Sequence, residues 1–127
     1  MTTEDAARRW AEVWSRAWPA ADLEAIVALY TADAVYLSHP FRPRQTPREY
    51  VGDVFGVQAA AECRFGEPIV SGDRAAVDWW GFITNTDGSV ETVAGTSLLK
   101  FDADGLVVEQ RDAWAGEPVH RELDWPG

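Results

Sequence analysis

The sequence predicts an α+β domain, in which three helices pack on one face of a strongly curved, mostly antiparallel sheet and enclose a pocket. Apolar residues recur at helical spacing in three segments of the first half of the chain. Four later segments show the alternation of strands, and short turn sequences separate them. The length of 127 residues suits one domain spanning 1–127, with a loose polar tail at 116–127.

The first predicted helix begins at the capping group Thr3-Glu4-Asp5 and runs to about Ala17, because Pro19 is expected to end it. An aromatic stripe follows one side of this helix, with residues four apart: Trp10, Trp14 and Trp18. Such a stripe is typical of a core face, and in this fold it is also expected to cover the pocket.

Two further helices and a strand are predicted before residue 60. Asp22 caps a short helix within DLEAIVALY, and the segment 33–38 indicates a strand. The sequence TPRE at 46–49 is typical of a helix start, with a capping threonine, a first-turn proline and a capping-box glutamate. This third helix is expected to weaken at Gly56.

The second half of the chain reads as strands joined by tight turns. The predicted strands span 61–70, 75–84, 91–101 and 106–114. The turn sequences SGD, TDG and DADG separate them. Because helices precede strands instead of alternating with them, the pattern favours an α+β sheet over a parallel α/β sheet.

The charge balance excludes several classes of partner. The formal net charge is -10 at pH 7, and hydrophobic residues make up 46% of the chain. Such a field repels phosphate backbones and anionic lipid, so no nucleic-acid or membrane partner is expected. The segment MTTEDAARRW lacks the apolar run of a signal peptide, and no stretch is long enough to span a membrane. A cytoplasmic location is therefore expected.

Metal and cofactor motifs are absent from the sequence. The single cysteine, Cys63, excludes an intramolecular disulfide and a cysteine-based metal site. The two histidines, His39 and His120, are isolated, so no zinc site is expected. There is no glycine-rich phosphate loop and no GxSxG sequence. The expected chemistry therefore needs neither metal nor cofactor.

Three stretches carry a resemblance to a known family: DLEAIVALYTADAVYLSHPF, FDADGLV and RDAW. In order and spacing they resemble the nuclear transport factor 2-like superfamily, in its SnoaL-like branch. The resemblance covers roughly residues 5–115 and implies a cone-shaped α+β barrel, a bent sheet wrapped around a pocket. Proteins of this superfamily include isomerases, dehydratases, polyketide cyclases, epoxide hydrolases and non-catalytic binding subunits, so the fold alone does not imply one function.

The ketosteroid isomerase branch offers a comparison of individual positions. Its proton-shuttling acid corresponds to His39 here, its oxyanion-hole tyrosine to Trp14, and its protonated aspartate to Ser97. An indole N–H is a poor substitute for a phenol, and a serine is not a carboxylic acid. Steroid isomerisation by that mechanism is therefore not expected, although the pocket is.

Strand alternation predicts which side chains face the pocket. His39 is the expected general base, since imidazole titrates near neutral pH, and Asp112 is expected to hold it in one tautomer. The alternatives are a histidine bonded to a backbone carbonyl at a strand end, and a carboxylate paired with an arginine at the pocket mouth. The residues expected to bind a small apolar molecule are Trp14, Trp18, Phe55, Trp80, Ser97, Gln110 and Trp114.

The same alternation places Trp79, Thr96 and Leu98 on the outer face of the sheet. An apolar patch there, together with the family resemblance, indicates a homodimer through the outer sheet face.

Three functional hypotheses remain open from the sequence. The first is a cofactor-independent isomerase, cyclase or dehydratase. The second is a binding protein for a small apolar molecule, in which His39 only donates or accepts a hydrogen bond. The third is a structural homodimer whose cavity is filled by its own tryptophans.

Overall fold

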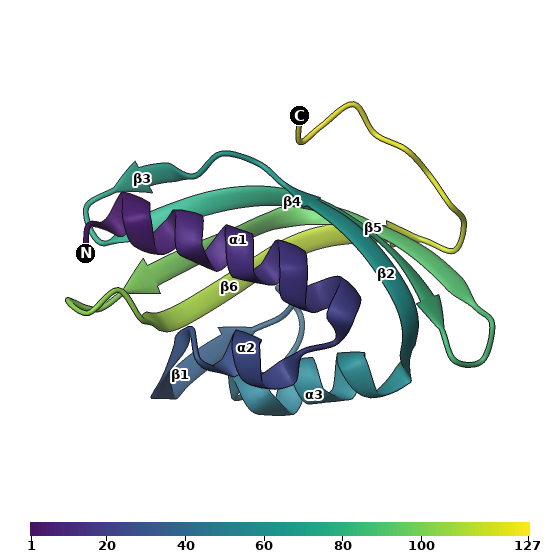
Figure 1. The fold of residues 1–127 in the computed structure, drawn as a ribbon, viewed down its shortest axis with the longest axis horizontal. Helices are drawn as coiled ribbons and strands as arrows, with labels where there is room; N and C mark the ends of the chain where they lie inside the picture. Colours follow the sequence, from purple (N-terminus) through teal and green to yellow (C-terminus); the bar gives the residue numbers. More distant parts are fainter.

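A computed structural model describes residues 1–127 and shows helices packed on the concave side of a curved, unclosed sheet (Figure 1). The chain forms α1 (Thr3–Ala20), α2 (Leu23–Val27), β1 (Tyr30–Leu37), α3 (Pro47–Val57), β2 (Gln58–Phe65), β3 (Ile69–Ser71), β4 (Arg74–Asn85), β5 (Val90–Phe101) and β6 (Val107–Glu117). The predicted α+β class is confirmed. No helix is both long and apolar enough to cross a membrane.

Helix α1 is longer than predicted at its carboxyl end. Thr2 and Asp5 form a capping box at its start, and the helix continues through Pro19 to Ala20. Pro19 lacks the N–H that would bond to the carbonyl of Ser15 one turn earlier. The thiol of Cys63 on β2 donates to that carbonyl instead, with Sγ 3.6 Å from the oxygen. A neighbouring strand thus satisfies the group that the proline leaves free.

The other two helices begin where the sequence predicted. Asp22 accepts a hydrogen bond from the backbone N–H of Ala25 at the start of α2. Thr46 and Glu49 form a reciprocal capping box around Pro47 at the start of α3. Helix α3 was expected to weaken at Gly56, but it continues through this residue to Val57.

The sheet has six strands, and its long path runs in the order β1-β6-β5-β4-β2, with β3 paired to β4. Only β1 and β6 pair in parallel. The predicted strand at 61–70 is two strands, β2 and β3, which both pair with β4. The long antiparallel ladders β4–β5 and β5–β6 set which side chains face the helices.

The predicted faces of β4 are reversed in the structure. Val77 pairs with Ser97 and Trp79 pairs with Gly95, so Trp79 lies on the inner face with Ser97. Trp80 lies on the outer face, where its Nε1 donates to the backbone oxygen of Arg121. The expectation that Trp80 would line the pocket and Trp79 would lie outside is therefore wrong. A one-residue difference in register exchanges the two faces of a strand. Because Trp79 and Trp80 are identical residues, the sequence does not indicate which of them faces the pocket.

The carboxyl-terminal tail is not loose. Strand β6 continues to Glu117, and the following residues return across the outer side of the sheet, opposite α1 (Figure 1). Thr92 on β5 donates to the backbone oxygen of Val119, and Pro126 is buried. The outer face that the sequence assigned to a dimer interface is thus partly covered by the chain's own tail.

Trp18 packs directly on the sheet at Gly81. An added Cβ at Gly81 would lie 2.5 Å from Cη2 of Trp18. The indole also meets Trp79 edge to face, with the ring centroids 6.1 Å apart. The missing side chain at this one position of β4 therefore lets the last turn of α1 approach the sheet closely.

We expect Gly81→Ala to lower the free energy of unfolding by about 1–3 kcal/mol, because the new methyl group must displace the Trp18 ring. Urea denaturation followed by circular dichroism measures the change. Gly56→Ala is the matched control: nothing lies within 4 Å of its added Cβ, and alanine favours a helix, so this variant should be at least as stable as the wild type. Equal stability of the two variants would contradict the packing argument.

Candidate functional site

A cavity of about 220 Å³ lies between the helices and the inner face of the sheet. Fourteen of its twenty lining residues are hydrophobic, so it suits a largely apolar molecule. An engineered cavity of about 150 Å³ holds benzene, which makes this one large enough for a substituted ring or two small fused rings. The cavity is not filled by the chain's own tryptophans.

Most of the predicted pocket residues line this cavity. The members that do so are Trp14, Trp18, Phe55, Ser97, Gln110, Asp112 and Trp114. Trp80 and His39 do not. Residues that strand alternation did not identify complete the lining, among them Tyr36, Arg42, Tyr50, Phe65 and Trp79.

Asp112 is the buried carboxyl group of the cavity. Its residue is 7% exposed, and it pairs across β5–β6 with Ser97. Ser97 Oγ donates to Asp112 Oδ1 over 2.6 Å, and Gln110 Nε2 donates to the same oxygen over 3.0 Å. Both of these bonds end on the same carboxylate oxygen, Oδ1.

Burial raises the pKa of Asp112 to about 6, while hydrogen bonds from Ser97, Gln110 and Tyr36 oppose the rise. The carboxyl group therefore changes its protonation state close to neutral pH. An ordinary exposed aspartate is fully ionised there and holds a proton too weakly to return it to a substrate.

A chain of hydrogen bonds fixes Gln110, which in turn orients Asp112. The indole N–H groups of Trp10 and Trp14 each donate to the Tyr30 hydroxyl over 3.2 Å. That hydroxyl donates to Gln110 Oε1 in a short hydrogen bond. The amide orientation of Gln110 is thereby set, with Nε2 toward Asp112. The indole of Trp14 thus donates a hydrogen bond to Tyr30. The comparison with individual positions of the ketosteroid isomerase branch did not identify this tyrosine.

A second chain fixes Ser97 from the other side. Trp79 Nε1 donates to Ser97 Oγ over 2.9 Å, so the serine hydroxyl directs its own proton to Asp112. Ser97 on β5 and Asp112 on β6 stand directly across from each other in the ladder, which brings the serine hydroxyl to the carboxyl group.

Two tyrosines, Tyr36 and Tyr50, line the cavity together with Asp112. Tyr36 on β1 accepts a hydrogen bond from Gln110 Nε2 over 2.8 Å and stacks on Tyr50 of α3, with the ring centroids 4.9 Å apart. Burial raises the pKa of Tyr50 to about 12, and the charge of Asp112 adds to the rise. Burial likewise raises the pKa of Tyr36 well above its usual range. Both phenols are therefore neutral hydrogen-bond donors or acceptors at physiological pH.

The structure does not bring His39 and Asp112 together. His39 Nδ1 accepts a hydrogen bond from the backbone N–H of Phe41 over 3.2 Å, and the imidazole packs edge-on against Trp114 with centroids 5.3 Å apart. The predicted contact between the two side chains is therefore wrong. His39 does not line the cavity itself, although its ring packs against Trp114, which does.

The mouth of the cavity combines an arginine with an aromatic ring. The Arg42 guanidinium lies 5.3 Å from the centre of the Trp114 ring, and Trp114 Nε1 donates to the backbone oxygen of Ser38 over 2.6 Å. The sequence placed no arginine on an inner strand face. Arg42 reaches the lining from the proline-rich loop, where strand alternation does not apply.

The arrangement is suited to moving a proton within an apolar site. It offers the buried carboxyl group of Asp112 with its raised pKa, two neutral phenols and an aromatic wall. No group of three or more His, Cys, Asp or Glu side chains in the structure is placed to share a metal ion.

Comparison with known proteins agrees with this architecture. The model of the SnoaL-like domain family matches residues 7–110. A structure of the epoxide hydrolase/cyclase-like enzyme SalBIII, described in pyran ring formation in polyether salinomycin, superposes with a TM-score of 0.76 at 18% identity, covering 90% of this chain and 95% of that one. No curated protein matches the sequence.

Two further solved structures share the fold. An NTF2-like protein of unknown function from Exiguobacterium sp. 255-15 has a TM-score of 0.70 at 18% identity, covering 87% of this chain and 98% of that one. A hypothetical protein with a ketosteroid isomerase-like fold from Catenulispora acidiphila, in complex with trimethylamine, has a TM-score of 0.67 at 18% identity, covering 80% and 81%. At these identities the likeness shows the fold alone.

The raised pKa of Asp112 predicts a pH dependence of stability. The folded chain binds this proton more tightly than the unfolded chain, since about 6 exceeds the ordinary value of 3.8. The stability that Asp112 contributes is therefore greatest below pH 4 and falls by about 3 kcal/mol as the pH rises through 6.

Asp112→Asn removes this titration. We expect the free energy of unfolding of the variant, relative to the wild type, to improve by about 2 kcal/mol between pH 4 and pH 7. Urea denaturation of both proteins at the two pH values measures the difference. A constant difference between them across this range would show that Asp112 is ionised in the folded state already at pH 4.

Proposed function

Because the chain belongs to the SnoaL-like domain family, we propose that it is a cofactor-independent enzyme that moves a proton within a small, apolar, cyclic molecule. The observation that supports this most directly is Asp112, a carboxyl group with a pKa of about 6 in an aromatic cavity. Groups that titrate near the working pH are effective proton carriers. The reaction class is isomerisation, cyclisation or dehydration.

Asp112 is the proton carrier in this proposal. Its ionised form takes a proton from a carbon next to a substrate carbonyl, and the electron pair moves onto the carbonyl oxygen. Return of the proton to another carbon completes an isomerisation. Its delivery to a leaving hydroxyl group completes a dehydration. No electron acceptor or co-reactant is needed, because the same proton is removed and given back.

Tyr50 is the proposed donor to the carbonyl oxygen on which charge develops. Tyr50 lines the cavity, and its pKa of about 12 keeps the phenol neutral. Its hydroxyl can therefore donate a hydrogen bond. A hydrogen bond to a developing oxyanion in a site of low polarity stabilises the transition state more than the ground state. Ser97 and Gln110 act on the substrate only through Asp112, because both donate hydrogen bonds to its carboxyl group.

His39 has no part in this mechanism. The sequence favoured it as the base, but its imidazole is outside the cavity lining and Nδ1 already accepts a backbone hydrogen bond. Asp112 takes the role of general base that was expected of the histidine. Arg42 at the mouth favours a substrate with an oxygen acceptor at its outer end.

The rival proposal is a binding protein without turnover, for which the apolar lining alone is sufficient. A panel of one-ring and two-ring ketones and enones, screened by the shift in melting temperature and by proton exchange at the carbon next to the carbonyl, separates the two. An enzyme exchanges that proton with solvent deuterium. A binding protein raises the melting temperature and exchanges nothing.

We expect Asp112→Asn to lower the exchange rate by about 10²–10⁴-fold while the ligand-induced shift in melting temperature persists. In the wild type, kcat/KM should rise with pH through about 6, since the ionised carboxylate is the base. Asp33→Asn is the matched control, because Asp33 is exposed on β1 outside the cavity. Full activity of the Asp112 variant would exclude Asp112 as the proton carrier.

A further inference from the structure

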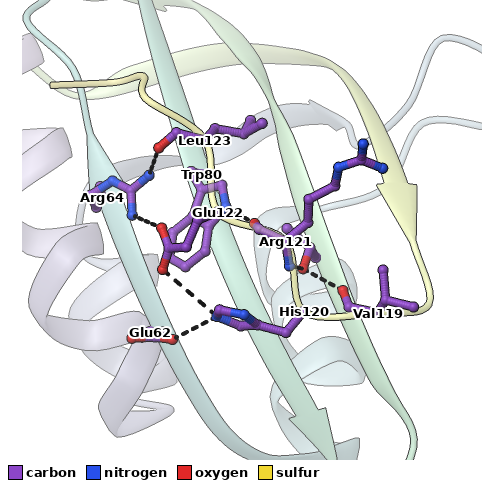
Figure 2. A network of polar contacts seen from close by, with 9 residues as sticks. Glu62, Arg64, Trp80, Val119, His120, Arg121, Glu122 and Leu123 are labelled. Atoms are coloured by element: carbon purple, nitrogen blue, oxygen red, sulfur yellow. Dashed lines mark hydrogen bonds and ion pairs between the residues drawn. The ribbon is translucent and has the colours of Figure 1, made fainter.

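Arg64, on the outer face of the sheet, shows how this chain pairs an arginine with a carboxylate. Its guanidinium carbon lies 4.1 Å from the centre of the Trp80 ring, so the ring covers one face of the cation. The guanidinium donates to Glu122 Oε2 over 3.1 Å and to the backbone oxygen of Leu123 over 2.9 Å (Figure 2). An arginine stacked on an aromatic ring thus keeps its N–H edge free for oxygen acceptors.

The mouth of the cavity has a second arginine of this kind. The guanidinium carbon of Arg42 lies over the Trp114 ring, 5.3 Å from its centre. The ring itself is held in place, because Trp114 Nε1 donates to the backbone oxygen of Ser38 over 2.6 Å. Unlike Arg64, Arg42 takes part in none of the ion pairs of the structure. Its N–H edge is therefore available to a ligand.

Arg42 is the only basic residue among the twenty that line the cavity. Its charge reaches Tyr50 on the same lining: burial raises the pKa of Tyr50 to about 12, the charge of Asp112 adds to this rise, and the charge of Arg42 opposes it. The Tyr50 hydroxyl is thus within electrostatic range of both the buried acid and the cation at the mouth. One ligand that lies against Tyr50 can therefore meet Asp112 at one end and Arg42 at the other.

We propose that the substrate of this cavity carries a carboxylate, which Arg42 binds at the mouth while the ring of the substrate lies against the aromatic wall. This inference rests on the proposed function, since it names the substrate class of the same site. A carboxylate has two oxygens in one plane and accepts two parallel N–H bonds from a guanidinium. A lone carbonyl or hydroxyl oxygen uses only part of that edge. The substrate class is therefore a ring ketone or enone with a carboxylate at its outer end.

The charge of the molecule favours a carboxylate over a phosphate monoester. The net charge of -10 works against every anion, so the attraction must come from direct contact with Arg42. One guanidinium matches the single charge of a carboxylate. A phosphate monoester carries up to about two negative charges near neutral pH, and the second has no basic partner on the lining. A monoanion is therefore the ligand that this mouth can bind.

Glu91 of β5 also lines the cavity and limits the affinity for an anion. A Cβ added to Gly116 would lie 3.5 Å from the carboxyl carbon of Glu91 and 3.3 Å from Cζ3 of Trp114, so this acid is close to the ring that Arg42 covers. Glu91 and Arg42 are nevertheless not an ion pair. Removal of each charge should therefore change the affinity for a carboxylate in opposite directions.

The test compares pairs of probes that differ only in charge: cyclohexanone, cyclohexenone and indanone, each bearing either a carboxylate or the carboxamide of the same size. Isothermal titration calorimetry at pH 7 and low salt gives the affinity of each. We expect the wild type to bind the best carboxylate about three- to tenfold more tightly than its carboxamide. Arg42→Gln should abolish this preference, and Glu91→Gln should increase it by about two- to threefold.

Arg44→Gln is the matched control, because it removes the same charge from the same loop at a residue outside the cavity lining. This variant should keep the preference of the wild type. Thermal melting checks the fold of Arg42→Gln, which should be stable since Arg42 is exposed and makes no ion pair. A wild type that binds no carboxylate probe, or that binds the carboxamides equally well, overturns the proposal. So does an Arg42 variant that keeps the preference.

The result is independent of the test of the proposed function, because it measures binding and not turnover. A preference for the carboxylate that depends on Arg42, without proton exchange in the bound probe, would support this substrate class and contradict the enzyme. Proton exchange that is equally fast for the carboxylate and the carboxamide, in the wild type and in Arg42→Gln, would support the enzyme and overturn the substrate class.

Discussion

The buried carboxyl group of Asp112 is the constraint on which the rest of the site depends. A carboxylate in an apolar cavity is unfavourable unless hydrogen bonds compensate for the lost water. Here two donors, Ser97 and Gln110, share its Oδ1, and each donor is itself fixed by a second layer of indoles and phenols. The tryptophans that make the cavity apolar therefore also supply the N–H groups that orient its buried acid, Asp112.

The two faces of the sheet serve different purposes because adjacent residues of one strand point in opposite directions. Trp79 extends inward and donates to Ser97, while Trp80 extends outward and donates to the backbone oxygen of Arg121 in the C-terminal tail. One dipeptide thus contributes both to the cavity and to the covering of the outer face. A shift of one residue in the β4 register would exchange the two rings and disrupt both.

Much of the fold could be predicted from the sequence, because local signals specify it. Helix caps at Asp22 and Thr46 mark the helix starts, and the turn sequences mark the hairpins. Part of the site could also be predicted from the sequence, because strand alternation placed Ser97, Gln110 and Asp112 on the face that lines the cavity. Alternation applies only within strands, so it could not predict that His39, just after the end of β1, is absent from the cavity lining and that Arg42, in the following loop, is part of it.

The sequence by itself determined the α+β class, the aromatic stripe of α1 and the residues on the inner face of β5 and β6, because these depend on spacing along the chain. Only the tertiary structure decided three things: which of Trp79 and Trp80 faces inward, whether His39 contacts Asp112, and where the tail docks. Each of them depends on the pairing of segments distant in sequence. Register between such segments is set by the packing of the whole domain, and no local pattern of residues encodes it.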